Sequence, residues 1–146
     1  MSWAQYVKAA TDLGFTKVAI VARANYQVVG TTNAQTDIAT AYQDGDKQIN
    51  ENQELLDDWN DAKKVTFSFF GKKQNIILRD EDDSFIVCAK GKEVLLARQF
   101  KTIWFVVYGS AKPKNAPKED PGFKGAQDAL TQISNNVWDG LAEAGV

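Results

Sequence analysis

The chain has 146 residues, enough to bury a hydrophobic core in one piece, and we interpret residues 1–146 as a single domain. Its net charge of −2 excludes a strong general attraction to nucleic acid, and its longest apolar run, residues 103–108, is too short to span a bilayer. Histidine is absent from the sequence, which excludes Ser-His-Asp and Cys-His nucleophiles and imidazole metal sites. With no other signature of a catalytic centre, metal or cofactor, we predict a non-enzymatic protein. The single cysteine, Cys88, excludes an internal disulfide and indicates a reducing, cytoplasmic location.

The N-terminal segment, residues 2–13, is predicted to be an amphipathic helix. Its apolar side chains recur at spacings of three and four: Trp3, Tyr6, Val7, Ala10 and Leu13. Ser2 is a suitable N-cap, and Gly14 is a suitable residue just beyond the helix end. Two β-rich runs follow, residues 17–24 and 26–31, and predict a hairpin around Ala24–Asn25.

Residues 34–62 are polar and acidic, with eight acidic side chains and one lysine. Ile38, Ala41 and Tyr42 indicate a short helix, and apolar residues between Ile49 and Trp59 indicate a second one that ends near Asn60.

Five further strands are predicted at residues 65–70, 74–80, 85–90, 94–99 and 102–109. Tight turns join most of them, which favours antiparallel pairing, and their imperfect alternation is typical of a sheet covered on both faces. Residues 110–123 form an extended loop that contains all three prolines. The last segment, 122–145, is a helix with Leu130, Ile133, Val137 and Leu141 on one stripe.

This order predicts an α+β fold. A central, mainly antiparallel sheet of about six or seven strands carries the N- and C-terminal helices packed together on one face and the short helices on the other. Cys88, within an apolar strand, is expected to be a small core residue.

The sequence resembles the profilin family of actin-monomer-binding proteins over nearly its whole length. The resemblance depends on the order and spacing of several segments: SWAQYV, KVAIVA, ELLDDWND, FGKKQNIILRD, TIWFVVYG and LAEAGV. It implies a compact fold with neighbouring terminal helices and three ligands, namely actin, poly-L-proline segments and phosphoinositides.

In profilins, aromatic side chains of the terminal helices line a groove for polyproline. Carried over, this groove would contain Trp3, Tyr6, Trp138 and Leu141. The sequence departs from the family where Val29, Gly140 and Val146 stand in place of aromatic or histidine residues, so weak polyproline binding is expected. The alternative is that Trp3, Tyr6 and Trp138 only pack the two helices together.

The actin-facing surface implied by the resemblance is a basic one. Its candidate residues are Trp59, Lys73, Arg79, Lys90, Lys92, Lys124 and Gln127. Segment 63–101 has nine basic and five acidic residues, and such a surface would steer encounter with an acidic actin monomer. The alternative is an ordinary solvated strand edge. The same lysines are candidates for phosphoinositide head groups.

We therefore expect a monomeric, cytoplasmic protein of the cytoskeleton that binds actin monomers and regulates actin polymerisation, with weak polyproline and phosphoinositide binding. Proline-rich proteins are further expected partners, and binding to nucleic acid is not expected. The alternative is an α/β adaptor of the longin or roadblock type, acting in trafficking or as a GTPase scaffold, which would be expected to dimerise.

Overall fold

The computed structural model describes residues 2–25, 27–32, 41–51, 59, 66–69, 72–79, 85–110 and 123–146. Its helices are α1 (Trp3–Leu13), α3 (Ala126–Ile133), the π-helical turn η1 (Ser134–Trp138) and α4 (Asp139–Glu143). Its strands are β1 (Lys17–Ala22), β2 (Val28–Thr31), β3 (Ala41–Asp44), β4 (Lys47–Asn50), β5 (Thr66–Phe69), β6 (Lys72–Arg79), β7 (Phe85–Lys90), β8 (Glu93–Gln99) and β9 (Ile103–Ser110).

Seven strands form one sheet in the order β2-β1-β9-β8-β7-β6-β5, and every neighbouring pair is antiparallel. A two-residue turn, Gly91-Lys92, joins β7 to β8, and β1 pairs with β2 as the predicted hairpin. The first and last strands of the chain are neighbours in the interior of the sheet, where β1 pairs with β9 from Lys17–Tyr108 to Ala22–Ile103. The predicted mainly antiparallel sheet is confirmed.

The two faces of the sheet each bury a separate hydrophobic cluster. Side chains alternate between them along β9, so that Phe105 and Val107 lie under the terminal helices while Trp104 and Val106 lie on the opposite face. The same alternation occurs in β1, β7 and β8. Cys88 is fully buried on the face away from the helices, as expected of a core residue. Burial on both faces explains why these strands are nearly continuous apolar runs in the sequence.

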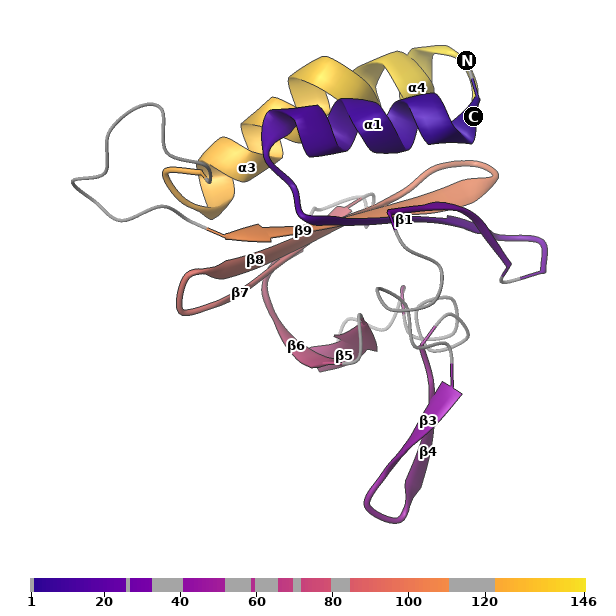
Figure 1. Ribbon diagram of the computed structural model, residues 1–146, viewed down its shortest axis with the longest axis vertical. Helices are drawn as coiled ribbons and strands as arrows, with labels where there is room; N and C mark the ends of the chain where they lie inside the picture. The colour runs from indigo at the N-terminus through magenta and orange to yellow at the C-terminus, as the bar shows by residue number, and fades with distance from the viewer. Residues whose placement is uncertain are drawn as a thin grey trace.

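The terminal helices lie side by side on one face of the sheet and run in opposite directions (Figure 1). The two ends of the chain therefore lie together at one end of the molecule, beside the turn that joins β8 to β9. A backbone hydrogen bond of 2.9 Å from Lys101 N–H to the Val146 carbonyl ties the end of the last helix to that turn. The predicted packing of the first and last helices is confirmed. None of the helices in the described ranges is long and apolar enough to cross a membrane.

The C-terminal helix is continuous but irregular, because η1 inserts a wider turn between α3 and α4. The Asp139 N–H donates to the Ser134 carbonyl, five residues back, as in a π-turn. The wider turn aligns Trp138 with Ile133 on the buried face, and Val137 and Leu141 are buried there as well. The predicted apolar stripe is thus correct, while the π-turn is a feature that periodicity alone did not indicate.

The segment around residues 41–50 differs from the sequence-based prediction. Ala41–Asp44 is a strand rather than part of a helix, and it pairs with Lys47–Asn50 in a separate two-stranded sheet that projects from the body of the molecule (Figure 1). Gly45 adopts φ of 60° in the turn between them, a conformation that glycine tolerates best. The turn chemistry of Asp44-Gly45-Asp46 therefore outweighs the weak helical spacing. The remainder of both predicted short helices, except Glu51 and Trp59, and residues 111–122 of the predicted loop lie outside the described residues.

Candidate ligand-binding surfaces

Trp3 and Tyr6 form an aromatic pair on the first turn of α1. Their ring centroids are 6.0 Å apart with an angle of 46° between the ring planes, and both side chains are partly exposed. Both rings also pack against the core beneath the helices. Within the described part of the chain, neither the Trp3 indole N–H nor the Tyr6 hydroxyl has a hydrogen-bond partner. The pair thus combines apolar ring surface with polar groups that remain available to a ligand.

A capping box holds the turn that carries this pair. The Gln5 backbone N–H donates to Ser2 Oγ at 3.3 Å, and the Ser2 backbone N–H donates to Gln5 Oε1 at 2.8 Å. These bonds satisfy two backbone donors that the first turn of a helix would otherwise leave without acceptors. The cap therefore orders the chain end and fixes the aromatic pair on the body of the protein.

Gly30 of strand β2 lies directly against the part of α1 that carries the aromatic pair. A Cβ atom added to Gly30 would lie 3.2 Å from Trp3 Cβ and 3.3 Å from Val7 Cγ2, so only glycine lets α1 approach this closely without displacement. The neighbouring Val29 has no register partner, because the β1–β2 pairing shifts between Ile20 and Val21, and its side chain is 40% exposed. The position at which the resemblance implies an aromatic residue is therefore an exposed valine at a bulge.

Trp138 and Leu141 do not lie on the surface. Both side chains have 0% exposure, and the Trp138 ring packs edge-on against Phe105 with centroids 6.3 Å apart. The sequence-based expectation that Trp138 supplies a ring to a polyproline groove needs correction, because a residue without exposed surface cannot contact a ligand in this conformation. The π-turn is the physical reason, since it directs Trp138 into the core.

Gly140, on α4, is exposed, and apart from its own helix no described residue lies within 4 Å of the place a Cβ would occupy. It lies in the helix that runs beside α1 (Figure 1). Val146, the third position where the sequence departs from the family, is partly buried against the helix-covered core. In the described residues, the predicted groove is therefore reduced to the aromatic pair, with open space on the neighbouring helix.

Three of the predicted actin-facing residues come together at the opposite end of the sheet. Glu93 pairs with Ser110 in the β8–β9 register, and the Phe123 N–H donates to the Ser110 carbonyl at 3.1 Å. Lys92 precedes Glu93 and Lys124 follows Phe123, so both exposed lysines flank the same junction. The exposed Gln127 follows in the first turn of α3, and the Lys124 backbone N–H donates to Asp128 Oδ2 at 3.0 Å.

Strand β6 adds exposed apolar side chains that the sequence analysis did not single out. Ile77 is 58% exposed and Leu78 is 47% exposed. Leu78 pairs with Val87, whose side chain lies in the core beneath the helices, so Leu78 is on the face of the sheet that carries α3. We refer to Leu78, Lys92, Lys124 and Gln127 as the α3 surface. The missed signal in the sequence is the aliphatic run Ile76-Ile77-Leu78, of which two side chains are exposed.

The other predicted actin-facing residues are either buried or have side chains outside the described part of the chain. Trp59 is only 3% exposed and packs against Trp104, with centroids 6.4 Å apart, on the face of the sheet away from the helices. It is a core residue, which corrects the expectation of a surface contact. Lys73, Arg79 and Lys90 lie in β6 and β7, and their side chains are outside the described part.

A tyrosine on the face of the sheet away from the helices, Tyr108, has a raised pKa. The Tyr108 hydroxyl donates to Glu93 Oε1 at 2.5 Å, and Lys17 Nζ lies 5.6 Å from the centre of its ring. Partial burial, and then the hydrogen bond and negative charge of Glu93, raise the pKa of Tyr108 to about 12. Tyr108 thus remains protonated at physiological pH and links β8 to β9 at this end of the sheet.

The architecture matches solved profilin structures over the whole chain. Acanthamoeba castellanii profilin II aligns with a TM-score of 0.69 at 16% identity, covering 99% of this chain and 100% of the other. LokiProfilin1, solved in complex with rabbit actin, aligns with a TM-score of 0.61 at 16% identity, covering 99% and 98%. Mouse profilin IIa, solved in complex with a double repeat from the FH1 domain of mDia1, aligns with a TM-score of 0.60 at 14% identity and full coverage of both chains. No protein-family model and no curated protein sequence matches the chain. The chain thus has the profilin fold at low sequence identity.

Proposed function

We propose that this protein binds monomeric actin and regulates its polymerisation. The observation that carries the proposal is the whole-chain similarity of fold to profilins, among them LokiProfilin1 and LokiProfilin2, which were solved as complexes with rabbit actin. On this proposal the protein is non-enzymatic and acts in the cytoplasm with the actin cytoskeleton. Its effect comes from occupying one end of the actin monomer.

The α3 surface is the proposed actin contact. It combines an apolar element, Leu78, with two exposed lysines and the amide of Gln127, a mixture typical of a protein interface with a polar rim. The lysines are suited to steering an acidic partner, which raises the association rate more than the final affinity. Lys73, Arg79 and Lys90 are further proposed contacts. Trp59 is not one of them, because it is buried against the face of the sheet away from the helices.

The aromatic pair, Trp3 and Tyr6, is the proposed polyproline contact. A polyproline II helix is already extended in solution, so binding it to flat rings costs little ordering entropy. The indole N–H and the phenol hydroxyl can each donate to a proline carbonyl. We expect weak affinity, because the described groove lacks the rings at Val29 and Gly140 that the resemblance implies. Phosphoinositide binding by exposed lysines is a subsidiary proposal.

Monomeric actin tests the main proposal directly. In a pyrene-actin assay, the protein should slow spontaneous polymerisation in proportion to its concentration, and Leu78→Asp should reduce this effect strongly. Val29→Asp is the matched control, because Val29 is a similarly exposed aliphatic residue on the edge strand β2, far from β6 in the sheet. If the wild-type protein leaves both polymerisation and monomer co-migration unchanged, the proposed function is wrong. If Leu78→Asp matches Val29→Asp, actin binds elsewhere.

Intrinsic fluorescence tests the polyproline contact. Of the four tryptophans, Trp59, Trp104 and Trp138 are buried and only Trp3 is partly exposed, so a spectral change on adding poly-L-proline reports on Trp3. Trp3→Ala should abolish that change while Trp138→Phe should retain it. A full signal in Trp3→Ala would locate the groove elsewhere.

A further inference from the structure

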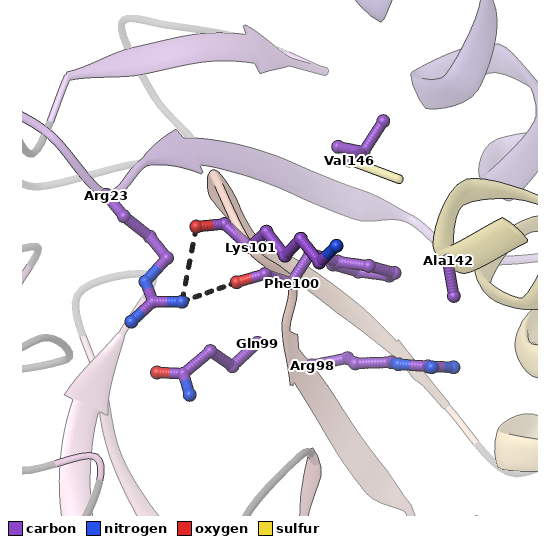
Figure 2. A pocket seen from close by; sticks show the side chains of 7 residues that line it. All are labelled: Arg23, Arg98, Gln99, Phe100, Lys101, Ala142 and Val146. Atoms are coloured by element: carbon purple, nitrogen blue, oxygen red, sulfur yellow. Dashed lines mark hydrogen bonds between the residues drawn. The ribbon is translucent and has the colours of Figure 1, made fainter. Parts of the chain in front are cut away.

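A third candidate site lies at the turn between β8 and β9, at the end of the molecule where the two chain ends meet (Figures 1 and 2). It is a pocket of about 310 Å³. It is lined by three cationic side chains, three apolar ones and one amide: Arg23, Arg98, Lys101, Phe100, Ala142, Val146 and Gln99. Neither the actin contact nor the aromatic pair uses these residues. We refer to this site as the turn pocket.

Most of the hydrogen-bonding capacity of Arg98 is unused. Its guanidinium lies 4.9 Å from the centre of the Phe100 ring, and Nη1 is 3.5 Å from Oδ1 of Asp139, a long contact to a side chain that is 59% exposed. Arg98 Nε is buried and has no hydrogen-bond partner among the described residues. Stacking therefore holds the side chain in place more than hydrogen bonds do, and an acceptor brought to the pocket would gain donors without displacing a strong bond.

Lys101 provides a second cation without a counter-charge. The residue is exposed, and its ammonium group forms no ion pair or hydrogen bond within the described ranges. In Figure 2 the Arg98 and Lys101 side chains extend from the turn toward α4, where Ala142 lies. The pocket thus carries more positive than negative charge, with Asp139 the acidic side chain in contact with it.

Arg23 gives the turn a fixed shape. Its Nη1 donates to the carbonyl of Phe100 at 2.6 Å and to that of Lys101 at 3.4 Å, and its guanidinium lies 5.3 Å from the centre of the Trp104 ring (Figure 2). The Lys101 N–H in turn donates to the Val146 carbonyl. Because β1, the turn and the last helix are joined in this way, the rim of the pocket is positioned before any ligand arrives.

The position of the turn pocket relates it to the aromatic pair. Helix α1 begins at Trp3, at the same end of the molecule as the turn and the last residues of the chain (Figure 1). A polyproline II segment advances about 3.1 Å per residue, so prolines bound to the aromatic pair carry their flanking residues well beyond it. An extended ligand that follows this end of the molecule would bring those residues toward the turn pocket.

We propose that the turn pocket receives an acidic side chain that flanks the proline segment of a peptide ligand, so that this protein selects proline-rich partners with an adjacent Asp or Glu. The inference rests on the proposed polyproline contact. An acidic side chain suits the lining because its methylene groups can pack on Phe100, Ala142 and Val146 while its carboxylate accepts from Arg98 and Lys101. A free phosphate would use only the cationic half of the pocket.

Synthetic decaproline peptides extended by Asp-Asp or by Asn-Asn, at either end, test the proposal. At low salt the better placed Asp-Asp peptide should bind about fivefold more tightly than its Asn-Asn counterpart, and the gain should shrink as salt is added. Lys101→Gln should remove most of the gain without affecting unextended decaproline. Lys92→Gln is the matched control, because Lys92 is an exposed turn lysine at the other end of the sheet.

Each other outcome overturns the inference in a recognisable way. If the Asp-Asp and Asn-Asn peptides bind equally well, the acidic selectivity is wrong while polyproline binding stands. If no peptide binds, the polyproline contact and the inference are both wrong. If inorganic phosphate at matched ionic strength shifts the amide resonances of Lys101 and Val146 and the Asp-Asp peptides do not, the pocket is a free-anion site.

Discussion

The indole ring of Trp138 meets the phenyl ring of Phe105 edge-on, at 68° and 6.3 Å between centroids, in the core beneath the terminal helices. This contact joins the π-turn to the central strand β9. Because Trp138 is fully buried, Trp138→Ala should lower the free energy of unfolding by about 3–5 kcal/mol, measured by urea denaturation. Trp138→Phe should cost less, since it keeps the ring contact and removes an indole N–H that has no partner in the described part of the chain.

Trp138→Phe also tests whether Trp138 contacts a ligand or only packs in the core. Trp138→Phe should bind poly-L-proline as the wild-type protein does, once both are shown to be folded by circular dichroism. A folded Trp138→Phe that binds polyproline much more weakly would contradict the assignment of Trp138 to the core alone.

Gly140 offers a site at which polyproline binding should improve. Outside its own helix no described residue lies within 4 Å of an added Cβ there, and a helical glycine is less favourable than other residues by up to about 1 kcal/mol. Gly140→Tyr should therefore fold normally and bind poly-L-proline several-fold more tightly, because it adds a ring on the helix beside α1. Fluorescence titration measures the affinity.

Gly140→Ala is the control for this gain. It should raise the melting temperature slightly, through helix propensity, and leave the affinity unchanged. An equal affinity gain in both variants would mean that helix stability, rather than the ring, was responsible.

The lysines of the α3 surface should control how fast actin is captured. Reversing both charges, Lys92→Glu with Lys124→Glu, should slow association with monomeric actin about tenfold at low salt and much less at high salt. Stopped-flow fluorescence with labelled actin measures the rate. Lys101→Glu, an exposed lysine at the other end of the sheet, is the control and should have little effect. Identical rates for all three proteins would exclude electrostatic steering by this surface.

The Tyr108–Glu93 pair predicts a loss of stability in alkali. The pKa of Tyr108 is raised from its ordinary value near 10 to about 12, so between these pH values the unfolded phenol loses its proton while the folded one keeps it. The unfolded state therefore binds fewer protons, and stability falls as pH rises through this range. Between pH 9 and pH 11 the melting temperature of the wild-type protein should fall more steeply than that of Tyr108→Phe. Equal slopes for the two proteins would contradict the raised pKa of Tyr108.

Much of the fold follows from local pattern. The spacing from Trp3 to Leu13 with Ser2 and Gly14 at its ends predicts α1 to within a residue, because capping and the buried stripe act together. The strands from β5 to β9 are predicted within one or two residues, since each is a short apolar run bounded by turn residues. The helix expected near Tyr42 is wrong, because the turn at Gly45 imposes a hairpin that weak spacing could not reveal.

The candidate sites depend more on tertiary structure. Sequence spacing indicates Trp3 and Tyr6 correctly as neighbours on one helix, since residues three apart share a face. It does not indicate that Trp138 turns inward, because that depends on a π-turn, nor that Arg23, Arg98 and Lys101 line one pocket. Those three residues come from β8 and two hairpin turns, and only the pairing of β1 with β9 brings them together.

The π-turn also determines how the chain can change in length. Asn135 and Asn136 are exposed and polar. A π-turn differs from an ordinary helical turn by one inserted residue. Ile133 and Trp138 lie five residues apart across this turn and share the buried face, and with one residue removed they would lie four apart on one face of a regular helix. Deletion of one asparagine should therefore leave Trp138 and Leu141 in the core, a tolerance of length that a mutational library would record as a gap at this one point of the helix.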